Sequence, residues 1–223
     1  MSELRTLDSL CTNRFRGLAR YGDGDFAVMR GQQDRYQKCE PKLAHALARS
    51  LSDPSPYVLN AIVPAPAEGP GNYRWICFWE ANAGIIGLLP KRTYGSASLS
   101  RMDSCPQNHT AEFWLKVSQL WKDSDITLVH GSERSLTAAK LMESPNAPKS
   151  IHTERSAFKN SWSMYDELLK GIEKAGNEKV VLCTGLVTRP LVHALCETGH
   201  RAYDLGHLGQ WFEKGLPIEV PHP

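Results

Sequence analysis

The sequence VVLCTGLVTRPLVHALCETGHRAYDLGH, at positions 180–207, joins two short apolar runs through an amphipathic segment. Both runs, Val180–Cys183 and Ala202–Leu205, have the length and the composition of buried strands. The segment between them carries Pro190 in its expected first turn and Gly199 at its expected end, as helices often do. Strand, helix and strand in this order predict parallel strands joined by a right-handed crossover.

The same alternation occupies the rest of the chain. Apolar runs at Leu18–Tyr21, Tyr57–Val63 and Ile126–Val129 predict three further strands. Apolar residues at helical spacing lie between the strands, at positions 43–51, 113–121 and 162–172. We therefore expect the α/β class: a single Rossmann-like domain over residues 1–223, with a mostly parallel sheet flanked by helices.

The composition is that of an ordinary globular protein, with 41% hydrophobic and 22% charged residues. It excludes collagen, coiled coil and a disordered chain. The longest apolar stretch is Gly84–Leu89, far short of the roughly 20 residues of a membrane span, and the N-terminus lacks a signal-peptide core. The six cysteines form no Cys-x-x-Cys pair, so neither a zinc finger nor a redox dithiol is expected. We expect a soluble cytoplasmic protein, in the host-cell cytoplasm if it is viral.

Two carboxylates follow the first expected strand. In RYGDGDF, at positions 20–26, Asp23 and Asp25 stand one residue apart between glycines. Glycine leaves the backbone free to turn, and carboxylate oxygens are ligands that Mg²⁺ and Mn²⁺ prefer. The pair therefore indicates a metal site; an ordinary surface turn is the alternative, because Gly-Asp-Gly is common in turns.

Three more segments have residues that suit phosphate. Arg92 and Arg101 bracket small and hydroxyl-bearing residues, and guanidinium groups bind phosphate oxygens well. His130–Arg134 and Thr184–Arg189 each follow an expected strand, where the N–H groups of a helix N-terminus can receive a phosphate or a nucleoside. None is a P-loop or a Gly-x-Gly-x-x-Gly motif, and each could equally be a polar surface loop.

Asp204 and His207 follow the last expected strand. Asp204 could cap the strand end and His207 could bond to backbone carbonyls; equally, His207 could complete a metal shell or contact a diphosphate. Because the carboxyl ends of parallel strands meet at one edge of the sheet, we expect these polar segments to line a single cleft.

Taken in order, these segments resemble the GT-D-type glycosyltransferases, a family first catalogued as a domain of unknown function. The resemblance covers about residues 15–213. The matching pieces are RYGDGDF (20–26), RTYGSASLSR (92–101), LVHGSERSL (128–136), SWSMYDELL (161–169), VVLCTGLVTRPLVHAL (180–195) and AYDLGHLGQWF (202–212).

The resemblance implies a Rossmann-like fold, a nucleotide-sugar donor, with a UDP-sugar favoured, and a divalent metal, Mn²⁺ or Mg²⁺. The family's first strand is followed by Asp-x-Glu, whose acids correspond to Asp23 and Asp25 here. Asp25 is one methylene shorter than glutamate, so contact with the metal through a water is an alternative to direct ligation. The histidine of the family's last motif corresponds to His207. Asp23, Asp25 and His207 are thus the expected catalytic and metal-binding residues.

A metal and arginines would stabilise the charge that grows on the leaving diphosphate. For the base that accepts the acceptor's proton, Asp103, Glu133 and Asp204 are candidates and none stands out. The residues expected to contact the donor or its phosphates are Arg20, Gly22, Arg92, Tyr94, Gly95, Ser96, Arg101, Ser132, Arg134, Thr184, Gly185 and Thr188.

The acceptor stays open between two classes. The resemblance favours the hydroxyl of a saccharide or glycoconjugate. The alternative is a virus-type acceptor, hydroxymethylated DNA, because residues 1–50 hold nine Lys/Arg against six Asp/Glu while the whole chain is only +2. A further alternative is a nucleotide-binding module without catalysis, which the change at Asp25 motivates; a phosphatase or nuclease is the least favoured. The basic residues concerned are Arg14, Arg16, Arg20, Arg30, Arg35 and Lys38.

Overall fold

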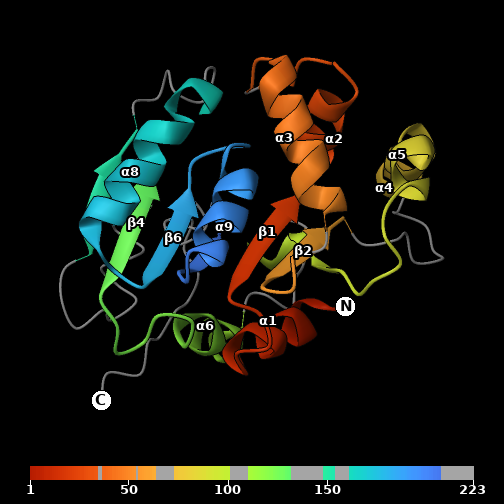
Figure 1. The fold of residues 1–223 in the computed structure, drawn as a ribbon. Coiled ribbons are helices and arrows are strands. Elements are labelled where there is room, and N and C mark those ends of the chain that lie inside the picture. The colour runs from red at the N-terminus through yellow and green to blue at the C-terminus, as the bar shows by residue number, and fades with distance from the viewer. Residues whose placement is uncertain are drawn as a thin grey trace.

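The computed structural model describes residues 1–34, 37–53, 55–63, 73–100, 110–131, 148–153 and 161–206. Within these described residues, seven strands form one sheet in the order β3-β2-β1-β7-β6-β4-β5 (Figure 1). Every strand pairing in it is parallel. The predicted α/β class with a mostly parallel sheet is therefore confirmed.

Five strands were predicted, and all five are present with ends that differ by at most one residue. Two others were not predicted: β3 is only two residues long, and β5 has a largely exposed, polar sequence. Neither shows the apolar run that identifies a strand in a sequence. The strands are β1 (Gly17–Tyr21), β2 (Val58–Ile62), β3 (Gly95–Ser96), β4 (Ile126–His130), β5 (Lys149–His152), β6 (Lys179–Cys183) and β7 (Arg201–Asp204).

Helices cover both faces of the sheet. Helix α1 (Glu3–Cys11) and helix α6 (Ala111–Ser118) pack their buried residues into one apolar cluster with Leu18, Leu128 and other strand residues. On the opposite face, four helices share a second cluster. They are α2 (Asp23–Met29), α3 (Pro41–Ser52), α8 (Tyr165–Ala175) and α9 (Thr188–Glu197).

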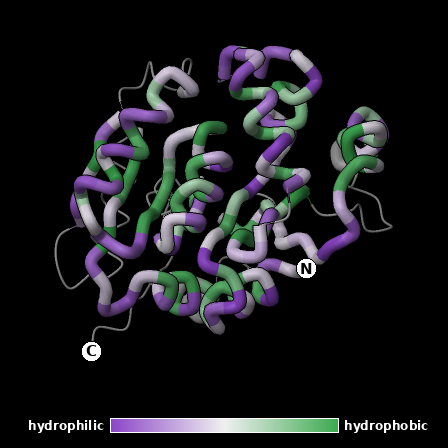
Figure 2. The backbone as a smooth tube through the Cα atoms, in the orientation of Figure 1, coloured by the Kyte–Doolittle hydropathy of each residue, from purple (hydrophilic) through white to green (hydrophobic). Residues whose placement is uncertain are grey.

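The central strands are apolar because both of their faces are covered. In β6, Val181 points into the α1–α6 cluster, whereas Val180 and Leu182 point into the α2–α3–α8–α9 cluster. A strand buried on both sides needs apolar residues at every position, which is why it appears as a continuous run in the sequence. Figure 2 shows mostly hydrophobic colouring in the central strands and an alternation of hydrophilic and hydrophobic residues along the helices.

The helix α9 begins and ends where the sequence predicts. Pro190 lies in its first turn, and Gly199, with φ 101°, follows its last turn in the left-handed region that favours glycine. Helix α2 is different, because it begins at Asp23. The expected Asp23-Gly24-Asp25 turn is therefore the first turn of a helix. The helix is not evident in the sequence because it is seven residues long and contains a glycine.

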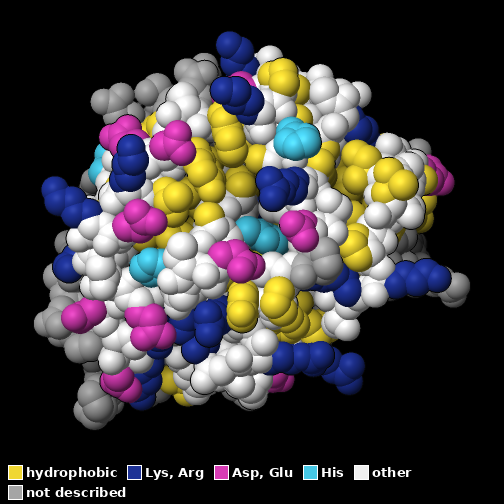
Figure 3. Space-filling view, viewed as in Figure 1, with side chains coloured by type: hydrophobic (Ala, Val, Ile, Leu, Met, Phe, Trp, Pro, Cys, Tyr) yellow, Lys and Arg dark blue, Asp and Glu magenta, His cyan; other side chains and the backbone are white. Residues whose placement is uncertain are grey.

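A pair of helices between β2 and β3, α4 (Tyr73–Ala81) and α5 (Ala83–Gly87), packs on α2. The rings of Phe26 and Phe78 meet edge to face at 5.1 Å, and Arg30 donates to the carbonyl of Ala81 and the side chain of Asn82. Figure 3 shows hydrophobic side chains gathered on the surface over α4 and α5. Among the described residues, no helix is both long and apolar enough to cross a membrane.

Candidate active site

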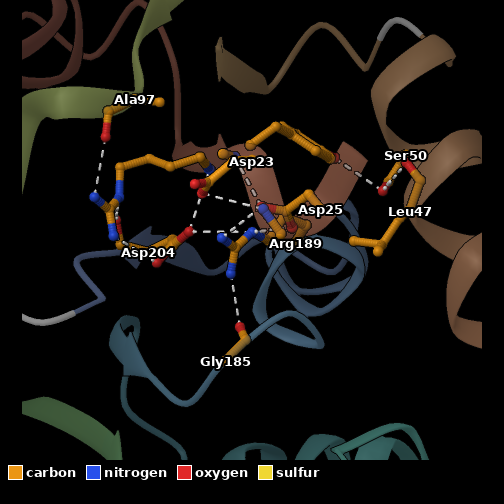
Figure 4. A network of polar contacts seen from close by, with 12 residues as sticks. Asp23, Asp25, Leu47, Ser50, Ala97, Gly185, Arg189 and Asp204 are labelled. Carbon is orange, nitrogen blue, oxygen red and sulfur yellow. Dashed lines mark hydrogen bonds and ion pairs between the residues drawn. The ribbon is translucent and has the colours of Figure 1, made fainter. Parts of the chain in front are cut away.

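Three neighbouring strands bring a charged cluster together at the carboxyl edge of the sheet. Asp23 and Asp25 lie in the first turn of α2, directly after β1, and Asp204 is the last residue of β7, which pairs with β1. Arg189 lies in the first turn of α9, which follows β6, the other neighbour of β7. Figure 4 shows Asp25, Arg189 and Asp204 turned toward one another, with Asp23 beside them.

Asp25 is enclosed and paired. Its side chain is 1% exposed. Oδ2 accepts hydrogen bonds from the Gly22 N–H at 2.8 Å and from Nη2 of Arg189 at 2.9 Å, and Oδ1 lies 2.9 Å from Nε of Arg189. Burial raises the pKa of the Asp25 carboxyl to about 6, against the opposing effects of Arg189 and the Gly22 N–H.

Arg189 joins three segments. Besides its contacts with Asp25, its Nε lies 3.6 Å from Oδ2 of Asp204 and its Nη1 donates to the Gly185 carbonyl at 2.7 Å. Burial alone would lower the pKa of Arg189, but Asp25 and Asp204 outweigh it and raise that pKa. The guanidinium is therefore a permanent positive charge held between two carboxylates.

Arg20 completes the network from β1. Its Nε donates to the Asp204 carbonyl at 2.7 Å, its Nη2 to Oδ1 of Asp204 at 3.2 Å and its Nη1 to the Ala97 carbonyl at 3.2 Å. A side chain at Gly206, whose φ is +53°, would collide with Nη2 of Arg20. Arg20 was predicted to bind donor phosphate; the structure instead directs its guanidinium to protein partners, so we assign it to the network.

Asp23 differs sharply from Asp25, although they are two residues apart. Asp23 is exposed, and its Oδ1 accepts a hydrogen bond from the Gly24 N–H at 3.1 Å. The carboxyl of Asp34 lies over Gly24, so that a side chain added there would come within 3.0 Å of the Asp34 carboxyl carbon. Of the predicted carboxylate pair, Asp23 is the one that presents oxygens to solvent.

A metal held directly by both carboxylates does not fit this arrangement. The Oδ2 of Asp25 is occupied by two donors, and its Oδ1 is buried against the positively charged Arg189. A divalent cation on either oxygen would lie a few ångströms from that guanidinium and would be repelled. Asp23 can offer one ligand. Among the described residues, no group of three or more His, Cys, Asp or Glu side chains is arranged to hold a metal.

The turn after β6 lies at the same edge. Gly185 adopts φ +76°, and Thr184 Oγ1 lies 3.2 Å from Oγ1 of Thr153 after β5. Thr188 is fully buried in the first turn of α9, and its hydroxyl has no hydrogen-bond partner among the described residues. The predicted Thr184, Gly185 and Thr188 are thus brought to the cluster through Arg189, and contact with a donor stays a prediction.

The predicted segment at positions 92–96 forms hydrogen bonds within the protein. Nη2 of Arg92 donates at 2.9 Å to the carbonyl of Val58, the first residue of β2, so this guanidinium lies toward the other end of that strand. Tyr94 donates from its hydroxyl to Pro90 and accepts from the N-terminal amine at its carbonyl.

Gly95 and Ser96 hold α1. A side chain at Gly95 would crowd Thr6. The Ser96 N–H donates to Thr6 Oγ1 at 3.0 Å, and the Ser96 hydroxyl donates to Glu3 Oε1 at 2.6 Å. The expectation that Arg92, Tyr94, Gly95 and Ser96 form a donor-binding loop is therefore not supported by where their polar groups bond.

Four of the predicted site residues lie outside the described residues: Arg101, Ser132, Arg134 and His207. So do two of the three candidate bases, Asp103 and Glu133. The third, Asp204, is 1% exposed and bonded to Arg20, so it is a network partner and not an accessible base.

Arg189 is the residue that sequence analysis did not select, although the predicted strand-to-helix segment ends on it. A signal was present: an arginine in the first turn of a helix opposes the helix dipole and needs acidic partners. The sequence could not say which acids these are, because Asp25 lies 164 positions away.

Comparison with known families decides the identity of this fold. A model of the glycosyltransferase GT-D fold family matches residues 18–221. The chain belongs to the GT-D fold family. The resemblance of its ordered motifs to GT-D glycosyltransferases is thereby confirmed.

Two streptococcal proteins are similar in sequence to this GT-D chain. It is 26% identical over 217 residues to the probable glycosyl transferase Gly of Streptococcus gordonii and 26% identical over 232 residues to the glycosyltransferase GlyD of Streptococcus pneumoniae serotype 4. The matches cover 91% and 96% of this chain but 31% and 28% of the relatives. The chain thus spans less than a third of the length of either relative.

Solved GT-D structures agree with the fold described above. One, reported as a domain of unknown function 1792 with a distinct glycosyltransferase fold, has a TM-score of 0.79 and 25% identity, covering 100% of this chain and 84% of that chain. Another, a glycosyltransferase from Streptococcus sanguinis, has a TM-score of 0.78 at 22% identity over 99% of this chain and 86% of that one.

Proposed function

We propose that this protein is a glycosyltransferase that moves a sugar from a nucleotide-sugar donor, a UDP-sugar first, to the hydroxyl of a saccharide or glycoconjugate. Membership of the GT-D fold family supports the reaction class. The observation that carries the site is the exposed Asp23 at the carboxyl edge of the parallel sheet, on a turn fixed by the Asp25–Arg189 contact. Ligands of open parallel sheets bind at this edge.

The donor diphosphate is proposed to lie between the first turns of α2 and α9. Both helices point their N-terminal ends toward this edge, where backbone N–H groups favour negative charge. Thr188, buried in the first turn of α9, has a hydroxyl without a hydrogen-bond partner among the described residues. A divalent cation, Mn²⁺ or Mg²⁺, would take one ligand from Asp23, and when bound it would stabilise charge on the leaving diphosphate.

The structure weakens the argument for hydroxymethylated DNA as the acceptor. Arg16 lies over the ring of Tyr57, just before β1 and β2 begin, so it stands at the edge of the sheet opposite Asp23. Arg14 precedes it along the chain and lies over Phe15. Arg20 and Arg30 are bonded within the protein. Of the six basic residues, Arg14, Arg16, Arg20 and Arg30 therefore do not form one surface around the candidate site, while Arg35 lies outside the described residues.

The test incubates the protein with a panel of nucleotide-sugar donors and identifies the products by mass spectrometry. Saccharide acceptors and hydroxymethylated DNA are tested in parallel, each once with Mn²⁺ and once with excess EDTA. Asp23→Asn is expected to lower transfer roughly 100-fold or more, as losing one charge-stabilising group typically does. The matched control is Asp166→Asn, because Asp166 is also an exposed aspartate in the first turn of a helix. Tight nucleotide binding without hydrolysis or transfer would favour a non-catalytic module instead. Transfer of sugar to hydroxymethylated DNA but to no saccharide would show that DNA is the acceptor. Full activity in excess EDTA would contradict the proposed metal requirement.

A further inference from the structure

The two aspartates after β1 have different environments, and we propose that they have different tasks. Asp25 is an internal anchor and not a metal ligand, and Arg189 is the positioning residue that holds it, so that Asp23 is the aspartate of the pair that faces the ligands. This division of labour rests on the proposed function for the role of Asp23. The part that concerns Asp25 and Arg189 rests on their contacts.

The contact between Asp25 and Arg189 has two points. Nη2 of Arg189 donates a hydrogen bond to Oδ2 of Asp25 at 2.9 Å, and Nε lies 2.9 Å from Oδ1 as an ion pair that is not aligned as a hydrogen bond. A guanidinium that faces a carboxylate with two nitrogens fixes its orientation as well as its position, which a single contact cannot do. The Gly22 N–H adds a third contact from the helix's own N-terminus.

The same guanidinium connects the ends of three strands. Through Asp25 it holds the turn after β1, through Gly185 the turn after β6, and through Asp204 the end of β7. Side chains of both Arg189 and Asp25 are nearly excluded from solvent, at 12% and 1% exposure. Removing the arginine would therefore leave a buried carboxylate without its charged partner, which is strongly unfavourable.

A position for Asp23 follows from this arrangement. Asp23 lies in the first turn of α2 with an exposed side chain, and its Oδ1 accepts a local hydrogen bond from the Gly24 N–H. Where its oxygens lie relative to α9 depends on how the first turn of α2 is held, and Asp25 holds that turn. Arg189 thus acts on the ligands through Asp25 and Asp23 without touching them.

The experiment compares Arg189→Met, Asp25→Asn and the double variant in three measurements: chemical unfolding, Mn²⁺ binding in the absence of donor, and steady-state transfer. If Asp25 is an anchor, Arg189→Met raises the unfolding equilibrium constant roughly 100-fold or more, because the carboxylate becomes unpaired. Adding Asp25→Asn to it restores stability, because the buried charge disappears. Arg189→Met does not tighten Mn²⁺ binding. If Asp25 were a ligand, removing the competing guanidinium would tighten it.

A conservative variant separates positioning from folding. Arg189→Lys keeps the charge but loses the two-point contact. In folded protein we expect it to lower kcat more than it raises the KM of the donor. The matched control is Arg201→Met, because Arg201 is a half-buried arginine whose partners, the Tyr203 hydroxyl and the Leu10 carbonyl, are neutral. It should leave Mn²⁺ binding and kcat unchanged.

The outcomes are separable from those for the proposed function. Tighter Mn²⁺ binding in Arg189→Met, or a double variant no more stable than Arg189→Met, would overturn the anchor. If Arg189→Met does not fold and the double variant does, that difference supports it. If wild-type protein neither binds Mn²⁺ nor transfers sugar, the proposed function fails, while the unfolding measurements still decide whether Asp25 and Arg189 form the anchor.

Discussion

Two short polar segments of this protein, both expected to belong to the site, differ in where their polar groups bond. The segment at residues 22–25 connects through Asp25 to Arg189, far along the chain, and keeps Asp23 exposed. The segment at residues 92–96 directs its polar groups inward, to Val58, Thr6 and Glu3. The difference teaches that glycine, serine and arginine in a polar segment do not make a binding loop unless their polar groups are left facing the ligand.

The largest expected effect compares Arg20, in the charged network next to residues 22–25, with Arg92 in the other segment. Arg20→Met leaves Asp204 buried with its main partner removed, and we expect it to lower the free energy of unfolding by about 3–5 kcal/mol. Arg92→Met, which loses one hydrogen bond to a carbonyl, should cost about 1 kcal/mol. Denaturant titration of both variants measures this. Equal losses would show that the charged network is no more important for stability than the packing segment.

The pH dependence of stability probes His193, which lies near Arg92 and bonds to Asn60 at 2.9 Å. Burial, with help from Arg92, lowers the pKa of His193 to about 4. The unfolded chain, with a pKa of about 6.5, therefore binds the proton more readily, so stability falls as pH drops from about 6.5 to 4, by up to about 3 kcal/mol.

The raised pKa of Asp25 acts in the opposite direction, because its folded form gains a proton below about pH 6. The difference between wild type and His193→Gln isolates the histidine from this effect. We expect the stability of the variant to fall less than that of wild type between pH 6.5 and 4, measured by unfolding at each pH. A constant difference across this range would contradict a buried neutral His193.

A smaller effect is expected at Ser96. Ser96→Ala removes the hydroxyl that donates to the buried carboxyl of Glu3, which should lower the free energy of unfolding by about 1–3 kcal/mol. The KM for the donor should not change. Loss of donor affinity in a stable, folded variant would show that this segment does contribute to donor binding.

The smallest expected effect is at Tyr94. Tyr94→Phe removes one hydrogen bond to the Pro90 carbonyl from a partly exposed side chain, which should cost about 1 kcal/mol or less. Calorimetry with UDP should give the same affinity as wild type. Weaker binding would mean that the Tyr94 hydroxyl contacts the donor. Residues 92–96 would then belong to the binding site, as residues 22–25 are proposed to do.

Much of the sheet could be predicted because a strand covered on both faces needs apolar side chains throughout. The run at 180–183 shows this, and β7 and β2 were found in the same way. The strands β3 and β5 were not, since one has two residues and the other faces solvent at an edge. Helix α2 escaped prediction because its seven residues contain a glycine and two acids, which suggest a turn when viewed alone.

Local properties of the sequence were enough for the fold class, the ends of α9 and the position of Asp23 and Asp25 after the first strand. Hydrophobic periodicity, and the proline and glycine at helix ends, involve residues close together in the sequence, so these signals can be recognised without a structure. The roles of the two aspartates could not. They depend on β7 lying between β1 and β6, which brings Arg189 to Asp25 across 164 positions and leaves Asp23 outside the pair. The strand order arises from packing of the whole chain, and that order separates an exposed carboxylate from a buried one.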